Sequence, residues 1–204
     1  MLPEDLCCID RTSYANEEAS QRMISEIQTM VKPVPENLKP RRPLKDRVLA
    51  RHNLLLMDDQ SQFDGATSHE IRDHWRNEGH DELNSCAETL CFFSGLFGAR
   101  YNFCLFVDDI CLESLNHMGL PVVKILRRDF GHLEPEKRWY TIYPGFEDGR
   151  TAEHYQDVGW MYMDVLSYPE FYAYFSKEHT YWYDQYSRPP DMVFGFETPG
   201  FWRK

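Results

Sequence analysis

Two adjacent carboxylates, Asp108 and Asp109, directly follow the short apolar run 101–107, YNFCLFV. An apolar run of this length predicts a buried β-strand, and α/β proteins place functional groups at the carboxyl ends of such strands. Glu113 follows Asp109 one helical turn further on. Because Mg²⁺ takes one or two carboxylates and keeps several water molecules, Asp108, Asp109 and Glu113 are candidate ligands of a hard cation.

The same acidic pair has a simpler structural interpretation. Asp109 caps the helix expected at 110–117, and Asp108 adds negative charge at the positive end of its dipole. His117, at the end of that helix, is a candidate general base if the chain folds back over the strand end. The sequence therefore leaves open two interpretations: helix capping, or catalysis by Asp108, Asp109 and His117 in a metal-assisted hydrolase or phosphoryl-transfer enzyme.

Other catalytic patterns are weak. Cys111 lies in the first turn of the expected helix, where the helix dipole lowers the pKa of a thiol, whereas Cys104 lies inside the apolar run. No two histidines have the spacing of a zinc-peptidase motif, and no glycine-rich phosphate loop or nucleophile elbow is present. The sequence does not decide whether the protein is an enzyme.

A second candidate site lies in the polar, glycine-containing stretch 144–157, between strands expected at 138–143 and 159–165. Gly159 next to Trp160 permits close approach of the backbone to a ligand. We expect a ligand-binding site at the ends of these two strands. Its candidate residues are Tyr143, Arg150, Asp157 and Trp160.

The elements expected to position these groups alternate between helix and strand. Apolar residues spaced along 14–31 predict an amphipathic helix, which the prolines of the connector after it terminate. Further helices are expected after Thr67, after Ser85, at 110–117 and at 169–177, and further strands at 101–107 and 122–126. The pattern predicts an α/β or α+β fold: a single domain with a small mixed sheet flanked by helices. The short connection between 101–107 and 122–126 leaves parallel and antiparallel pairing open.

The expected domain organisation is a core with two arms. Residues 1–46 form an amphipathic helix and a proline-rich linker, 47–186 the globular core, and 187–204 an extended aromatic tail. The aromatic residues of the C-terminal region either form a contact surface or wrap the protein's own sheet. They are Tyr181, Trp182, Tyr183, Tyr186, Phe194, Phe196, Phe201 and Trp202.

Charge and composition narrow the class of partner. The chain has 33 acidic and 22 basic residues, a net charge of −11, which disfavours binding to nucleic acid. The segment 32–51 carries seven basic and two acidic residues and is read as a solvated linker, although a nuclear location is not excluded by it. No secretory leader and no apolar stretch long enough to span a bilayer is apparent, so we expect a soluble, cytoplasmic protein without a membrane partner.

These observations favour a non-catalytic interaction or ligand-binding protein. The expected partner is another protein or a second copy of the chain, bound through the N-terminal helix or the C-terminal tail. The alternative is the metal-assisted enzyme described above, and Mg²⁺ is expected only in that case.

Overall fold

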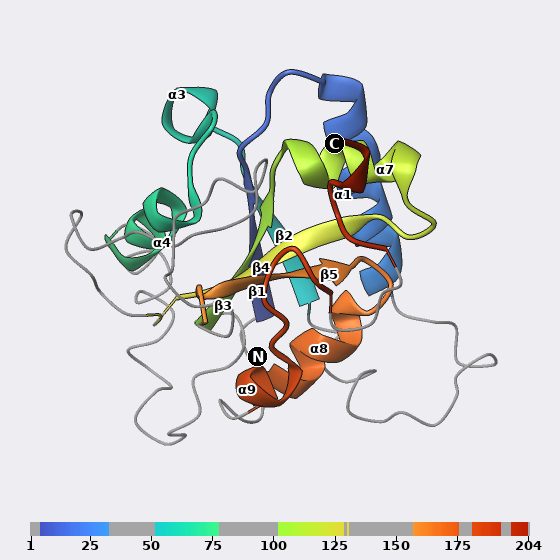
Figure 1. Cartoon of the computed structure of the whole chain (residues 1–204). Helices are drawn as coiled ribbons and strands as arrows, with labels where there is room; N and C mark the ends of the chain where they lie inside the picture. Colours follow the sequence, from blue (N-terminus) through green and yellow to red (C-terminus); the bar gives the residue numbers. More distant parts are fainter. Residues whose placement is uncertain are drawn as a thin grey trace.

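The computed structural model contains a five-stranded mixed sheet with helices on both sides (Figure 1). The strands are β1 (Asp5–Arg11), β2 (His52–Met57), β3 (Phe103–Val107), β4 (Val122–Arg127) and β5 (Trp160–Asp164). The expected fold class, a mixed sheet flanked by helices, is confirmed. The structure describes residues 5–32, 52–77, 102–128, 130, 157–175, 181–192 and 197–203.

The strand order is β2-β1-β3-β4-β5. β1 pairs in parallel with both β2 and β3, whereas β4 is antiparallel to β3 and to β5. The pairing left open between 101–107 and 122–126 is therefore antiparallel, and the parallel crossover is instead β1 to β2 through α1 (Glu17–Val31). The expected strands at 101–107, 122–126 and 159–165 correspond to β3, β4 and β5.

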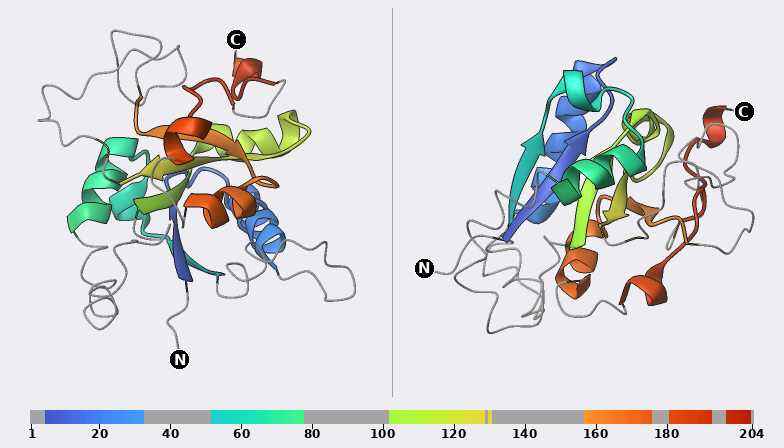
Figure 2. Two further views of the ribbon diagram at one scale, coloured as in Figure 1. Left: turned by 90° about the horizontal axis from the view of Figure 1, so that it is seen from below. Right: turned by 90° about the vertical axis from the view of Figure 1, so that its left-hand side faces the viewer.

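The helices cover the two faces of the sheet unequally (Figure 2). On one side lie α1, α7 (Asp109–His117) and α8 (Tyr168–Phe175), with contacts of α1 to both α7 and α8. On the other side lie the single-turn α3 (Gln60–Phe63) and α4 (Ser68–Asn77). Near the C-terminus, α9 (Tyr181–Gln185) and a 3₁₀ turn (Phe201–Arg203) complete the described elements.

Alternation along the strands determines which side chains face which helices. Arg11 on β1 reaches Glu17 of α1, and Phe103 on β3 stacks on Phe175 of α8 at 4.4 Å between ring centroids. Because successive side chains of a strand point to opposite faces, the intervening residues face the side of α4. These residues include Asp10, Cys104 and Phe106, together with Lys124 and Tyr162, which are in register with Phe106.

The N-terminal segment does not form a separate arm over residues 5–31. β1 is an interior strand, paired on both of its edges. The apolar face of α1 is buried within the protein, with Met23 and Ile27 fully inaccessible to solvent. The expected helix at 14–31 is confirmed as α1, but its partner is the sheet of its own chain. The proline-rich linker that follows lies outside the described residues.

The C-terminal region packs on the protein's own core where the structure describes it. Trp182 is fully buried and stacks on Phe103 at 5.5 Å, and the ring of Trp202 stacks on His117 at 4.8 Å. Of the two interpretations of these aromatic residues, wrapping of the protein's own sheet agrees with Trp182, which stacks on Phe103 of β3, whereas Trp202 packs on His117 of α7. Phe194 and Phe196, the helix expected after Ser85 and the strand expected at 138–143 lie outside the described residues.

A membrane-spanning helix is not found: within the described ranges, every helix is too short or too polar to cross a bilayer.

Candidate functional site

The carboxyl ends of β1, β2 and β3 meet at one edge of the sheet. From β1 the chain crosses to β2 on one side, whereas β3 lies on the other side of β1. The strand order therefore reverses at β1, which defines a topological switch point, the place where open α/β sheets bind ligands. The residues at this edge are Arg11, Thr12 and Ser13 after β1, Asp58 and Asp59 after β2, and Asp108 and Asp109 after β3.

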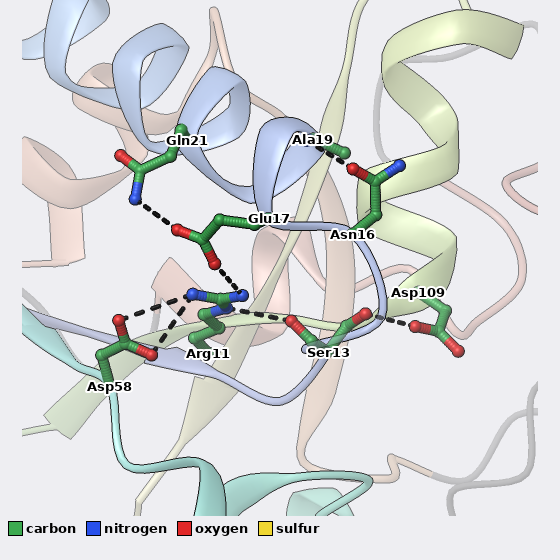
Figure 3. Close-up of polar contacts among 8 residues, drawn as sticks. All are labelled: Arg11, Ser13, Asn16, Glu17, Ala19, Gln21, Asp58 and Asp109. Carbon is green, nitrogen blue, oxygen red and sulfur yellow. Dashed lines mark hydrogen bonds and ion pairs between the residues drawn. The ribbon is translucent and has the colours of Figure 1, made fainter.

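Arg11 organises the β1 end of this edge (Figure 3). Its Nη2 donates to Glu17 Oε2 at 2.6 Å, its Nη1 lies 3.4 Å from Asp58 Oδ1, and its Nε donates to the carbonyl of Ser13 at 3.0 Å. The guanidinium also lies over the ring of Tyr14, 4.3 Å from its centroid. Hydrogen bonds from Gln21 and from Arg11 lower the pKa of Glu17. Arg11, only 5% exposed, is thus neutralised by two carboxylates from different elements.

The loop after β1 is tied to the end of β3. The backbone N–H and the hydroxyl of Thr12 both donate to the carbonyl of Val107, at 3.0 and 3.1 Å. The hydroxyl of Ser13 donates to Asp109 Oδ1 (Figure 3). Asp109 therefore binds the β1 loop, and the residue that caps α7 is Asp108, whose Oδ1 accepts from the N–H of Cys111 at 3.0 Å. The two aspartates therefore lie at the start of the helix as the capping interpretation expects, but Asp108 is the cap and Asp109 is the acidic residue of the first turn.

Asp108 also forms a buried ion pair with Lys124. The Lys124 ammonium lies 2.6 Å from Asp108 Oδ2, and the Lys124 side chain is 4% exposed. The ammonium also lies 4.8 Å from the ring centroid of Phe106, 4.2 Å from that of Trp160 and 5.5 Å from that of Tyr162. Burial favours the neutral acid, but Lys124 and the N–H of Cys111 outweigh it and lower the pKa of Asp108. Asp108 is therefore an anion with a fixed counter-ion.

The expected metal site is not formed by its three predicted ligands. Asp108 binds Lys124, Asp109 binds Ser13, and Glu113 accepts hydrogen bonds from Trp202 and from both Nε and Nη2 of Arg203. No group of three or more histidine, cysteine or acidic side chains suited to a metal occurs in the part of the chain that the structure describes. The helical spacing of Asp109 and Glu113 was misleading, because the C-terminal turn binds Glu113.

His117 does not reach the strand end either. It ends α7, whose first residue is Asp109, so about 12 Å of helix separates the two at 1.5 Å per residue. Its imidazole is stacked on Trp202 instead. Cys111 is fully buried, and burial raises the pKa of its thiol, contrary to the effect expected from the helix dipole alone. The predicted catalytic groups therefore do not converge.

The two described residues of the second predicted site, Asp157 and Trp160, have separate surroundings. Asp157 accepts from Trp182 Nε1 at 2.9 Å and lies 3.6 Å from Arg127 Nη1, so it anchors α9. Trp160 is fully buried beneath Lys124 on the face toward α4. Gly159 does permit a close approach, with φ of +75°, but the group beside it is the side chain of Phe130. Tyr143 and Arg150 lie outside the described residues.

A pocket of about 260 Å³ lies between α3 and α4 at the switch-point edge. A hydrogen bond of 2.9 Å from the N–H of Gly65 to the carbonyl of Thr12 joins it to the end of β1. Within it, Gln62 Nε2 lies 2.9 Å from His74 Nδ1, and the imidazole meets the ring of Phe63 edge-on at 4.9 Å. The pocket is lined by Gln62, Phe63, Asp64, Gly65, Ala66, Glu70 and His74.

Sequence reasoning missed this pocket, although it correctly predicted one part of it. Thr67 and Glu70 form the expected capping box, in which Glu70 Oε2 accepts from the N–H of Thr67 at 2.8 Å. A usable signal was the resemblance of LLLMDD, ending at Asp59, to CLFVDD, ending at Asp109. Both are apolar runs followed by two aspartates, and both end parallel strands at the same edge.

No protein-family model matches the chain, and neither the curated proteins nor the solved structures contain a match. Function is therefore inferred from the geometry of the chain itself, because a fold does not by itself define an activity.

Proposed function

We propose that this chain is a non-catalytic protein that binds a small polar ligand in the pocket between α3 and α4. One observation carries the proposal: the pocket adjoins the topological switch point of the sheet, because Gly65 in its lining donates its N–H to the carbonyl of Thr12 at the end of β1. Ligands of open α/β sheets bind outside the carboxyl ends of the strands, where the sheet holds the connecting segments in place.

The state of the polar side chains supports binding rather than catalysis. Arg11 is held by Glu17 and Asp58, and Asp108 is held by Lys124. A general base or a metal ligand needs lone pairs directed at a substrate or an ion. The metal-assisted enzyme loses its main support, because its expected ligands Asp108, Asp109 and Glu113 have separate partners.

Charge at this edge favours a neutral or cationic ligand. The N-terminus of α1, the usual position for a bound phosphate, is already capped by Asn16 and followed by Glu17 and Glu18. The pocket itself contains the carboxylates of Asp64 and Glu70. Its volume equals that of roughly nine water molecules at about 30 Å³ each, which suits a molecule no larger than a sugar ring. We therefore infer a small hydroxylated or amine-bearing ligand.

The other parts of the proposal concern partners and location. Docking through α1 has little support, because the apolar face of that helix is buried. Exposed aromatic surface is present on Tyr183, 65% accessible, and on Phe201, 42% accessible, which leaves the C-terminal region as the better place for a protein partner. A cytoplasmic location agrees with the free thiols of Cys104 and Cys111, since a reducing compartment preserves them.

The experiment is a thermal-shift screen with a defined panel: ribose, glycerol, ethanolamine, putrescine and inorganic phosphate. A ligand that binds only the folded state raises the melting temperature. We expect a hydroxylated or amine-bearing member to stabilise the protein and phosphate to have no effect. Glu70→Gln, which retains the capping box, and His74→Leu should weaken the stabilisation.

The matched control is Glu26→Gln, the same chemical change on the exposed side of α1. It should leave the shift unchanged. The proposal fails if no member of the panel stabilises the protein, or if the Glu70 and His74 variants respond like the control.

A further inference from the structure

Asp10 is a buried carboxyl group in the middle of the sheet. It has no exposed surface, and within the described residues its carboxylate meets no donor stronger than the thiol of Cys104. β1 is an interior strand, so Asp10 has Met57 of β2 on one side and Phe106 of β3 on the other. A buried carboxylate with only a weak thiol donor is costly, and native proteins rarely keep one without a reason.

The surroundings of Asp10 offer little compensation for a negative charge. Burial raises the pKa of Asp10 to about 7, and the thiol of Cys104 offsets only part of that effect. The Lys124 ammonium on the same face is already paired with Asp108. On this side of the sheet the charged and titratable groups of the described elements are Cys104 on β3, Asp108 at the N-terminus of α7, Lys124 on β4, Tyr162 on β5 and the buried Arg72 on α4. Helix α4 also carries the half-buried His69, Asp73 and His74 and the exposed Glu70.

Helix α4 packs on the side of the sheet to which Asp10 belongs. That helix lies over the face of the sheet to which Asp10 points, on the side opposite α1 (Figures 1 and 2). It packs through Ile71 and Trp75 and is anchored by Arg72, whose guanidinium donates to the carbonyls of Arg127 at 3.0 Å and Gly159 at 3.3 Å. The indole N–H of Trp75 is buried without a hydrogen-bond partner among the described residues. Two polar groups between α4 and the sheet, the Asp10 carboxyl group and the Trp75 indole N–H, are thus incompletely satisfied.

We propose that ionisation of Asp10 loosens α4 from the sheet, so that α4 acts as a pH-sensitive cover over the polar face of the sheet. When the carboxyl group is protonated, α4 stays packed. When it ionises, opening of α4 hydrates the charge and exposes the face that carries Lys124. Because Glu70 and His74 line the pocket, the same movement regulates the proposed ligand site, and this regulatory part alone rests on the proposed function.

Hydrogen exchange of backbone amides tests the movement without any ligand. The full-length protein is compared at pH 6, 7 and 8, with the chemical exchange rate of each amide divided out. The opening equilibrium of α4 should rise about tenfold between pH 6 and pH 8, because the closed state holds its proton to about pH 7 and the open state does not. Helix α1, on the opposite face, is the internal control and should change much less.

Asp10→Asn removes the charge while keeping the shape, and should abolish the excess exchange of α4. The proposal is wrong if α4 and α1 of the wild type respond equally to pH, or if Asp10→Asn retains the excess. Neither result affects the ligand-binding proposal, which the thermal-shift screen tests separately.

Discussion

Replacing Lys124 by methionine tests the buried ion pair at the edge of the candidate site. The substitution keeps an unbranched side chain of similar length but leaves Asp108, 22% exposed, with Cys111 as its hydrogen-bond donor among the described residues. Removing one member of a buried ion pair typically costs about 3–5 kcal/mol, because the other charge remains buried. We expect a loss of about 3 kcal/mol at pH 7, since Asp108 keeps some contact with solvent.

The pH dependence of this loss has a definite sign. In the wild type the pKa of Asp108 is lowered, so the pair contributes stability above the ordinary value of 3.8 and loses it as the pH falls through the lower folded value. Without Lys124, burial raises the pKa of Asp108, and protonation then relieves the unpaired charge. The difference between wild type and Lys124→Met should therefore be large at pH 7 and shrink toward pH 4.

Urea denaturation followed by circular dichroism at pH 7 and pH 4 measures both quantities. Lys32→Met, at the exposed end of α1, is the matched control and should change the free energy of unfolding by less than about 0.5 kcal/mol. The double variant Asp108→Asn/Lys124→Met should recover part of the loss, because no buried charge is left unpaired. The reasoning is refuted if Lys124→Met costs less than about 1 kcal/mol, or if its cost is the same at both pH values.

Two further predictions concern the backbone conformation at Gly159 and the contact between Glu113 and the C-terminal turn. Gly159→Ala should destabilise the protein by about 1–3 kcal/mol in thermal or urea unfolding, because Gly159 has φ of +75° and a Cβ there would collide with Phe130. Gly65→Ala should cost less, because Gly65 has a similar φ of +71° but open space around it. Equal losses of stability in the two variants would contradict this explanation. Glu113→Gln should lower stability by only about 0.5–1 kcal/mol, because Glu113 is 39% exposed, yet should make the C-terminal turn more susceptible to limited proteolysis. Hydrogen bonding by Arg203 lowers the pKa of Glu113, so the contact stabilises the protein above the ordinary pKa of 4.5 and weakens as the pH falls through the lower pKa of the folded state. Unchanged proteolytic cleavage in Glu113→Gln would argue that the contact does not hold the C-terminal turn.

Sequence reasoning was most accurate where one physical signal dominated. The strands β3 and β4 are nearly continuous apolar runs, as expected for strands buried on both faces, and α1 shows a clear helical period. β1 was missed because its second half, Ile9-Asp10-Arg11, carries two ionisable side chains that are buried only in the folded sheet. No local pattern distinguishes such residues from those of a solvated segment.

The candidate site depended on contacts between distant parts of the chain. The acidic pair at the end of β3 was correctly assigned to a strand end, but its partners come from elsewhere: Ser13 from the loop after β1 and Lys124 from β4. Glu113 was expected beside Asp109 because of helical spacing, whereas Arg203 binds it from the C-terminus. The pocket required the loop after β2 to meet β1 through Gly65 and Thr12, a contact that neither composition nor periodicity predicts.

Nuclear magnetic resonance titration tests the central claim of ligand binding most directly. ¹⁵N-labelled full-length protein is titrated with the member of the panel that stabilises it most, and backbone amide shifts are followed for the described residues. Ligand binding in the proposed pocket predicts saturable shifts of Gln62, Gly65 and His74 that Glu26→Gln retains and Glu70→Gln weakens. Saturable shifts confined to another surface, or no saturable shift with any member of the panel, would contradict the account.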